Sequence, residues 1–559
     1  MALYVLVISV LLATVAIIWR MRYPKLYPGI PYNLESARRF TGDIPELASA
    51  IGATGEICVS LFQVTTQKLG TPVAQLLSPG ARKPLIMVDD PREVEDIILR
   101  RGKEFDKAAL SVQMFSPMFP HAILSSFTTP ELKAQKRLWA DIMSVDFHRR
   151  AVAPIVHKAI MQLLDLWRLK ASTTYRDEAF EASDDCHNVA LDVIWGTITG
   201  DALGMVEYNI RKQQNQVAGE SLPRGAFIKK ETAYLAETFG GNAGSPFSAI
   251  LHAIHKMTPR YRAFKALVDG EIETIWRNAL ERFKRLDSRN LESGEYDICM
   301  TDFVLRRQHL EAAKTGNPVP DPVKDPVMRD EILAHMIAGY DSSANNMSWF
   351  VKFMEMFPAA QAELRAALRK AFPGPELPSI DAVLETSVPY LDATCEETFR
   401  FAHASGGNYR QAMVDTEILG YKIPKGATLF LSFQTMSPEF PIDENKRAPT
   451  CRAALEKSGD RMQGGAGRNL DTFNPRRWLD FNKSGDETFN PYALPMNGFG
   501  GGYRGCPGRK LAHVELRVFM VYTILAFEFL EVSENLKSTK AKEVLFREPA
   551  MSYVRLKSL

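Results

Sequence analysis

Residues 499–508 read FGGGYRGCPG and place a single cysteine, Cys506, at the end of a glycine-rich loop. Pro507 follows, and residues 508–529 form a long apolar run with helical spacing. Proline is favoured at the first position of a helix because its missing N–H is not needed there, so the pattern predicts a helix from Pro507. A thiol at a helix N-terminus has a lowered pKa and becomes a thiolate, which is a metal ligand or a nucleophile. Arg504 can bind a carboxylate through two parallel hydrogen bonds.

This loop resembles the haem-binding loop of the cytochrome P450 family. The family pattern F-x-x-G-x-R-x-C-x-G is filled by Phe499, Gly502, Arg504, Cys506 and Gly508. The resemblance implies that Cys506 is the axial thiolate ligand of a haem b iron, with Phe499 and Arg504 also contacting the cofactor.

An alternative interpretation rests on the glycines at 500, 502 and 505, which also spell the dinucleotide fingerprint G-x-G-x-x-G. That fingerprint needs a preceding strand and an acidic residue about 20 residues later within a βαβ unit. Residues 496–499, MNGF, precede the glycines and the chain is nearly finished, so the sequence favours haem over a nicotinamide cofactor.

The composition excludes several classes of protein. The chain has 559 residues, which predicts two domains or one large domain, and its hydrophobic content of 46% is that of a globular protein. A net charge of +2 gives no indication of nucleic-acid binding. The six cysteines have no paired spacing, which excludes a disulfide framework and suits a reducing compartment.

The N-terminus predicts a membrane anchor over residues 1–22. Residues 1–19 carry no charged side chain and as a helix would span about 28 Å, close to the hydrocarbon core of a bilayer. Arg20 and Arg22 follow the apolar run, which predicts a cytosolic location for the rest of the chain. A cleaved signal peptide would carry its positive charges before the apolar run, so we favour a single-pass anchor in the endoplasmic reticulum. Residues 23–34 are rich in proline and predict a stiff hinge.

Residues 71–107 predict a hairpin around SPGARK and then a helix that starts at Asp90 and Pro91. They resemble the first sheet of the family. Residues 108–129, which are rich in Met, Phe and Pro, correspond to a segment that caps the substrate pocket, with an ordinary apolar loop as the alternative. Residues 131–147 have a helical pattern and offer Lys136 where the family often has an arginine for a haem propionate. A solvated basic face is the alternative for Lys136.

Residues 325–357 predict one long helix that begins with an Asp-Pro cap and contains AGYDSSANN at its centre. Glycine, aspartate, serine and asparagine are poor helix formers, and a helix that breaks its own rules at the centre suggests a site. This stretch resembles the oxygen-activating segment A-G-x-D/E-T-T. The resemblance implies that Ala338 and Gly339 form the groove for O2 and that Asp341 and Ser342 relay protons. A polar kink that faces solvent is the alternative.

Residues 390–401 predict a helix that carries Glu397 and Arg400 on one face. They resemble the buried ion pair of the family, and Arg477 in FNPRRW fits the third member; the implied role is structural. An exposed surface pair is the alternative. Arg410 matches a propionate-binding arginine. Residues 420–433 predict two strands around a lysine-glycine turn, and residues 441–470 predict a surface insertion.

The fold implied is a mainly helical cytochrome P450 domain with a small β-rich lobe over residues 35–559. The function implied is haem-thiolate monooxygenation of a hydrophobic small molecule, as in natural-product biosynthesis, using O2 and NADPH. Electrons would come from a separate NADPH–cytochrome P450 reductase, with cytochrome b5 as a further candidate, and the basic surface near Arg476, Arg509 and Lys510 would receive the reductase. The alternatives are a rearrangement, dehydration or desaturation on the same haem, and a membrane-tethered haem binder without turnover.

Overall fold

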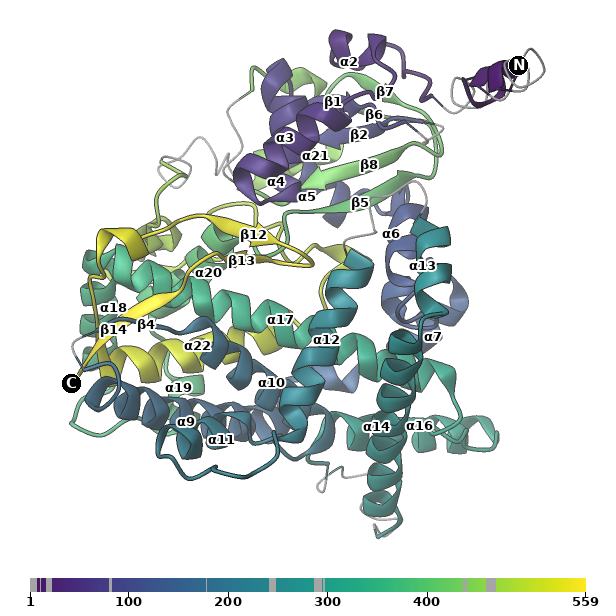
Figure 1. The fold of residues 1–559 in the computed structure, drawn as a ribbon. Helices are drawn as coiled ribbons and strands as arrows, with labels where there is room; N and C mark the ends of the chain where they lie inside the picture. The colour runs from purple at the N-terminus through teal and green to yellow at the C-terminus, as the bar shows by residue number, and fades with distance from the viewer. Residues whose placement is uncertain are drawn as a thin grey trace.

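A computed structural model describes residues 8–10, 12–16, 23–79, 83–176, 178–240, 248–285, 294, 297–435, 440–458 and 469–559. The chain forms a large helical body and a smaller lobe that contains the five-stranded sheet (Figure 1). This confirms the predicted mainly helical fold with a small β-rich lobe. The helices are α2 (Leu34–Arg38), α3 (Ile44–Thr54), α4 (Ile57–Phe62), α5 (Pro91–Leu99), α6 (Ala109–Phe115), α7 (Pro130–Leu138), α8 (Val145–Phe147), α9 (Ala153–Ser172), α10 (Ser183–Thr199), α11 (Met205–Gln213), α12 (Arg224–Gly240), α13 (Ser248–Lys256), α14 (Pro259–Lys284), α16 (Met300–Thr315), α17 (Pro326–Met356), α18 (Pro358–Ala371), α19 (Ile380–Glu385), α20 (Pro389–Ala402), α21 (Pro449–Ser458) and α22 (Arg509–Ala526).

The five-stranded sheet has the order β1-β2-β8-β5-β3, in which only β2 and β8 run parallel. Short pairs β9–β10, β12–β13 and β6–β7 and the three-stranded sheet β11-β14-β4 complete the β structure among the described residues. The strands are β1 (Val73–Leu76), β2 (Leu85–Val88), β3 (Phe105–Lys107), β4 (Phe180–Glu181), β5 (Gly407–Ala412), β6 (Thr416–Ile418), β7 (Tyr421–Ile423), β8 (Thr428–Ser432), β9 (Leu479–Phe481), β10 (Glu487–Phe489), β11 (Phe527–Leu530), β12 (Ala541–Glu543), β13 (Arg547–Pro549) and β14 (Tyr553–Ser558).

Helix α17 runs through the middle of the helical body, where α10, α20 and α22 pack against it (Figure 1). It begins where the sequence predicts: the Asp325 side chain accepts a hydrogen bond from the N–H of Val327, and Pro326 occupies the first turn. It is 31 residues long and ends just before Pro358. Because its flanks are buried, any exposed residue at its centre marks open space inside the fold.

The hairpin of β1 and β2, the helix from Pro91 and the two strands β7 and β8 are also confirmed. The single helix predicted over residues 131–147 is wrong, because α7 ends at Leu138 and α8 starts anew at Val145. Ser144 explains the break: its hydroxyl accepts the N–H of Phe147 at 3.0 Å and so caps a new first turn.

The predicted hinge, residues 23–34, lies against the small lobe. Tyr27 and Ile30 are buried, and the amide of Gln75 on β1 donates to both of their carbonyls. The anchor prediction, residues 1–22, lies outside the described residues except for 8–10 and 12–16. Among the described residues, no helix has both the length and the apolar character needed to cross a bilayer. The membrane anchor therefore stays a prediction.

The predicted surface insertion, residues 441–470, is described up to residue 458 and again from 469. Its described part reaches into the core, because the Arg447 side chain is fully buried and its guanidinium lies 2.8 Å from Asp90 and 3.7 Å from Glu93 at the start of α5. Thr450 in the same segment donates to Asp96. This segment therefore contributes buried ion pairs as well as surface.

Candidate active site

The cysteine loop lies against helix α5 and leads into α22. A side chain at Gly502 would meet the carbonyl of Ile98 at 2.7 Å, and its φ of +58° favours glycine as well. The N–H of Cys506 donates to the carbonyl of Phe499 at 2.8 Å, which closes the loop. Helix α22 begins at Arg509 rather than at Pro507, so the predicted helix start is wrong by two residues.

The Cys506 side chain is exposed to solvent, yet protein surrounds it on most sides. A thiol that faces an open space inside the fold is both accessible to solvent and surrounded by protein. Burial raises the pKa of the Cys506 thiol, and the N–H groups of Gly508 and Arg509 only partly offset this effect. The lowered pKa expected from the helix N-terminus is therefore wrong for the protein alone. A bound metal ion would supply the effect that lowers the thiol pKa, because a thiol that coordinates a metal is deprotonated outright.

A cluster of buried cations lies beside the loop. Arg410 on β5 pairs across the sheet with Lys107 on β3, and Arg504 lies close to both. Burial and then the charge of Arg504 lower the pKa of Lys107 to about 7 and that of Arg410 to about 10. Asp106 is the nearby carboxylate, 3.5 Å from Arg504.

Such a cluster fits a ligand with two carboxylates, because the ligand would supply the negative charge that the protein provides only in part. Lys136 extends the cluster: its ammonium lies 2.5 Å from the carbonyl of Tyr503, and burial and then Arg504 lower its pKa. The residues present therefore fit a haem, with a thiol for the iron and cations for the two propionates. The structure places Arg410, Arg504 and Lys136 together, and Phe499 packs edge-on against Phe399 at 4.9 Å beside the loop.

The oxygen segment of α17 is arranged around Ala338, which is exposed at the centre of a buried helix. The Ser342 hydroxyl donates to the carbonyl of Ala338 at 2.6 Å. Gly339 does not simply widen this groove, since a Cβ added there would meet Ile194 of α10 at 2.6 Å. Its missing side chain therefore lets α10 pack closely on α17. Asp341 lies 3.5 Å from the imidazole of His187 on α10.

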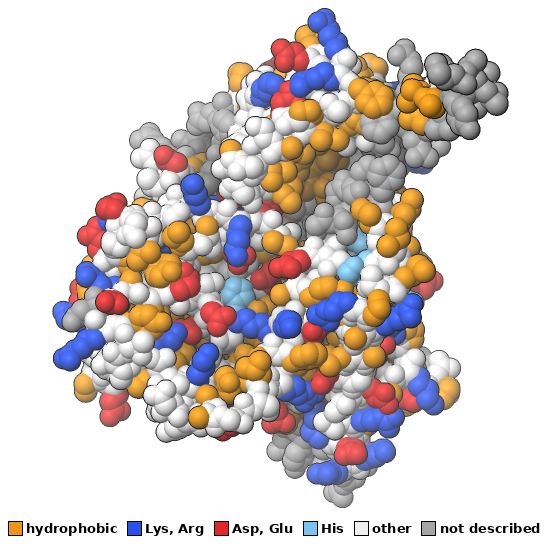
Figure 2. Space-filling view, in the orientation of Figure 1, with side chains coloured by type: hydrophobic (Ala, Val, Ile, Leu, Met, Phe, Trp, Pro, Cys, Tyr) orange, Lys and Arg blue, Asp and Glu red, His pale blue; other side chains and the backbone are white. Residues whose placement is uncertain are grey.

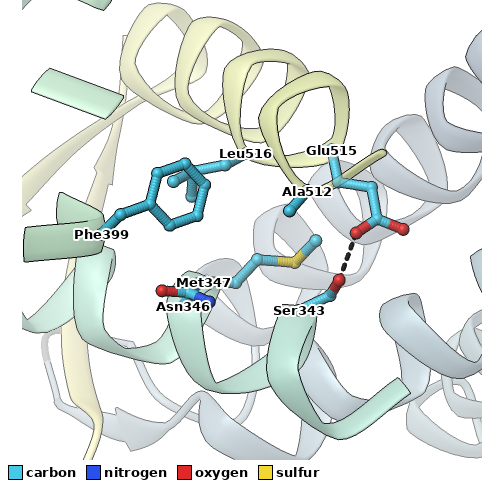
Figure 3. Close-up of a pocket in the computed structure, with 7 residues that line it drawn as sticks. All are labelled: Ser343, Asn346, Met347, Phe399, Ala512, Glu515 and Leu516. Atoms are coloured by element: carbon cyan, nitrogen blue, oxygen red, sulfur yellow. Dashed lines mark hydrogen bonds between the residues drawn. The ribbon is translucent and has the colours of Figure 1, made fainter. Parts of the chain in front are cut away.

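The Ser343 side chain points toward helix α22. Its hydroxyl donates to the carboxyl group of Glu515 on α22, next to a small cavity lined by Met347, Phe399 and other residues of α17, α20 and α22 (Figure 3). No other hydrogen bond reaches this carboxyl within the described residues. Burial raises the pKa of Glu515 to about 8, so the group is held mainly as the neutral acid at pH 7.

The structure brings Glu397, Arg400 and Arg477 together in the interior. Both guanidinium groups bond the carboxylate at 2.8–3.0 Å, and the exposed fractions of the three side chains are 0%, 0% and 1%. Trp478 Nε1 and the N–H of Asn474 donate to the same carboxylate at 2.9 and 2.7 Å. This network fixes the segment before the cysteine loop to helix α20.

The cytochrome P450 family model matches residues 53–439 and 469–554 of the chain. The chain belongs to the cytochrome P450 family. The match omits residues 440–468, which nearly coincide with the predicted insertion.

Three similar proteins from fungi match nearly the whole chain. A cytochrome P450 monooxygenase of Pestalotiopsis microspora, GME11363, is 29% identical and the match covers 99% of this chain and 98% of that protein. The monooxygenases TRI13 of Fusarium sporotrichioides and xilC of Penicillium rubens are 27% and 28% identical and match over at least 95% of each chain. A crystal structure of a cytochrome P450, CYP102L1, has the same fold, with a TM-score of 0.65, 17% identity and coverage of 96% of this chain and 100% of that one. The chain is thus a cytochrome P450 monooxygenase, and its family implies a thiolate-ligated haem, O2, a redox partner and a small-molecule substrate.

The sequence does not predict three residues of the site. Lys107 follows Asp106 in an unremarkable strand, and only the register with β5 brings it to Arg410. Glu515 and His187 occupy helical positions whose partners come from distant segments. The sequence carries no signal for these contacts, because each depends on a partner that only the fold brings near.

Proposed function

We propose that the chain is a haem b monooxygenase of the endoplasmic reticulum that oxidises a hydrophobic small molecule in a biosynthetic pathway for a natural product. It receives electrons from NADPH through a separate cytochrome P450 reductase, with cytochrome b5 as an additional donor. The observation that carries the cofactor is the solvent-accessible Cys506 thiol beside the cation cluster of Lys107, Arg410 and Arg504. The full-length similarity to fungal monooxygenases supports the reaction class.

Residues of the chain itself would bind the haem iron and the haem propionates. Cys506 would hold the iron and lose its proton on binding, while Arg410, Arg504, Lys107 and Lys136 would hold the two propionates. When bound, a thiolate-ligated haem supplies reductive activation of O2, with one oxygen atom inserted into the substrate and the other released as water.

Ser342 and Asp341 would control protons beside the open space at Ala338. Since the Ser342 hydroxyl donates to the Ala338 carbonyl at 2.6 Å, its lone pairs are left to accept and orient a proton donor. Asp341, one residue earlier, would replace the proton through a bridging water.

Apolar surface supports a membrane location and a hydrophobic substrate. Large hydrophobic side chains are exposed on the N-terminal segment and near α13, including Leu26, Phe40, Ile250, Ile254 and Met257. Figure 2 shows hydrophobic side chains gathered where the small lobe meets the helical body. Such surface attracts apolar partners.

The function can be tested with a substrate that the organism itself supplies. The gene is deleted in the organism that carries it, and metabolites that accumulate are incubated with membranes that contain the protein, a reductase and NADPH. We expect a product that carries one atom from heavy-isotope O2. A product formed without O2 incorporation would contradict the monooxygenase assignment and favour rearrangement, dehydration or desaturation.

A further inference from the structure

His187 connects the oxygen segment of α17 to the surface of α10. Its Nδ1 atom lies 2.8 Å from the carbonyl of Ser183, one turn earlier in the same helix. Its Nε2 atom lies 3.5 Å from Asp341 Oδ1. The side chains of His187 and Asp341 are 13% and 27% exposed, so water reaches both.

The contact with Ser183 decides where the imidazole carries its proton. A carbonyl oxygen only accepts hydrogen bonds, so Nδ1 must be the donor. Nε2 of the neutral ring is then an acceptor and cannot bond an ionised carboxylate. The close approach of Nε2 and Asp341 is favourable only when one of the two atoms carries an extra proton. The geometry therefore suits the exchange of one proton between Nε2 and Asp341 Oδ1.

The surroundings of the pair are acidic. Tyr340 on α17 stacks edge-on against the His187 ring at 5.5 Å, and the charges of Asp341, Asp184 and Glu548 add to burial in raising the pKa of Tyr340. Asp184, on the same helix as His187, is held by Lys229 of α12 at 2.5 Å, and Glu548 on β13 by Lys542. Asp341 is thus the acid that faces Nε2 directly, and the other acids near the pair have lysine partners.

We propose that His187 is the proton donor that replenishes Asp341 from solvent during turnover. The imidazolium gives its Nε2 proton to Asp341 Oδ1, which leaves a neutral ring with the proton on Nδ1 and a neutral carboxyl. Asp341 passes its proton inward and becomes a carboxylate again, and Nε2 takes a proton from water. No electron moves in this exchange. The inference rests on the proposed proton relay of Asp341 and Ser342.

The test uses the haem-loaded full chain with reductase and NADPH, and no substrate, so that the unknown substrate does not limit it. O2 reduced to peroxide takes up two electrons and two protons, so the net reaction consumes one NADPH and one proton. O2 reduced to water takes up four electrons and four protons, so the net reaction consumes two NADPH and two protons. We expect His187→Phe and His187→Gln to slow O2 consumption about tenfold. This lies below the roughly 10²–10⁴-fold typical of a donor at the reacting centre, because water also reaches Asp341.

His309→Phe is the matched control. His309 Nδ1 also lies against the carbonyl one turn earlier, at 2.9 Å from Leu305, but no carboxylate among the described residues is in ion-pair contact with it. This variant should keep the parental rate. The pH profile of O2 consumption should differ between the parent and both His187 variants, and His309→Phe should keep the parental profile.

The glutamine variant separates proton transfer from mere positioning, since its amide can donate to Asp341 but cannot release a proton. A parental rate and pH profile in His187→Gln would overturn the proposal, and so would an unaffected rate in His187→Phe. A parent that shows no O2 consumption at all would instead contradict the proposed function.

A second measurement does not depend on turnover. A double-mutant cycle of His187→Phe and Asp341→Asn, measured by urea unfolding, should show that the two changes are coupled by about tenfold in the unfolding equilibrium. Strict additivity would overturn the exchange of a proton between them.

Discussion

Arg477→Ala should strongly destabilise the protein, although the same change at the adjacent residue, Arg476, should not. Arg477 is 1% exposed and bonds the buried carboxylate of Glu397 at 3.0 Å. Arg476 is 54% exposed and pairs with Glu363 and Glu487 at the surface. The two substitutions remove the same side chain, so the difference between them measures burial.

The magnitude follows from the network around Glu397. Removing one partner of a buried ion pair typically costs about 3–5 kcal/mol, against a total stability of about 5–15 kcal/mol for a folded protein. In Arg477→Ala, Arg400 would still neutralise Glu397, so the loss of stability should lie near the lower end of the range of about 3–5 kcal/mol. Glu397→Ala leaves two buried guanidinium groups without their counter-charge and the Trp478 indole N–H without its acceptor, so its loss of stability should lie near the upper end of that range. An exposed pair contributes about 0–1 kcal/mol, so Arg476→Ala should be nearly neutral.

The assay is urea unfolding of the haem-loaded protein, followed by tryptophan fluorescence, together with the yield of haem-loaded protein. Where Glu397→Ala accumulates too little protein to unfold, the yield alone decides the comparison. Equal midpoints for Arg477→Ala and Arg476→Ala would refute the account of a buried structural network.

Four further predictions concern other parts of the molecule. The pKa of Glu515 is about 8 in the folded protein against an ordinary value of 4.5, so the stability from its neutral form is full below about pH 4.5 and is lost as the pH rises through about 8. A shift of this size corresponds to about 5 kcal/mol, and Glu515→Gln should flatten the pH dependence of urea unfolding; an unchanged slope would show that Glu515 is ionised. Ser342→Ala should keep haem but raise peroxide formed per NADPH consumed, and unchanged peroxide would remove Ser342 from the relay. Lys107→Gln should weaken haem retention during gel filtration relative to the surface control Lys133→Gln, whereas equal retention would place Lys107 outside the propionate site. Deleting residues 1–22 should release much of the protein from membranes with an intact haem spectrum, and loss of haem would show that the segment belongs to the fold.

The sequence predicts most of the fold because its signals are local. The Asp325 cap, Pro326 and a continuous apolar pattern determine where α17 begins, and turn residues between apolar runs determine the β1–β2 hairpin. The single helix predicted over residues 131–147 is wrong because Ser144 caps a new turn in the middle of an otherwise helical pattern.

Only the site residues that belong to a contiguous sequence motif can be predicted from the sequence. Cys506, Arg504 and Ser342 belong to contiguous motifs, whereas Lys107 reaches the cation cluster through sheet register and His187 reaches Asp341 through helix packing. The lowered thiol pKa expected from a helix N-terminus also fails, because the burial of Cys506 outweighs the two nearby N–H groups. Burial depends on the whole fold and cannot be read from ten residues.

The absorption spectrum of the reduced, CO-bound protein tests the central assignment most directly. We expect the parent to show the long-wavelength Soret band of a haem with a thiolate ligand, and Cys506→His to lose that band while other haem features remain. A parent spectrum typical of an imidazole-ligated haem, or a thiolate band that survives in Cys506→His, would contradict Cys506 as the iron ligand.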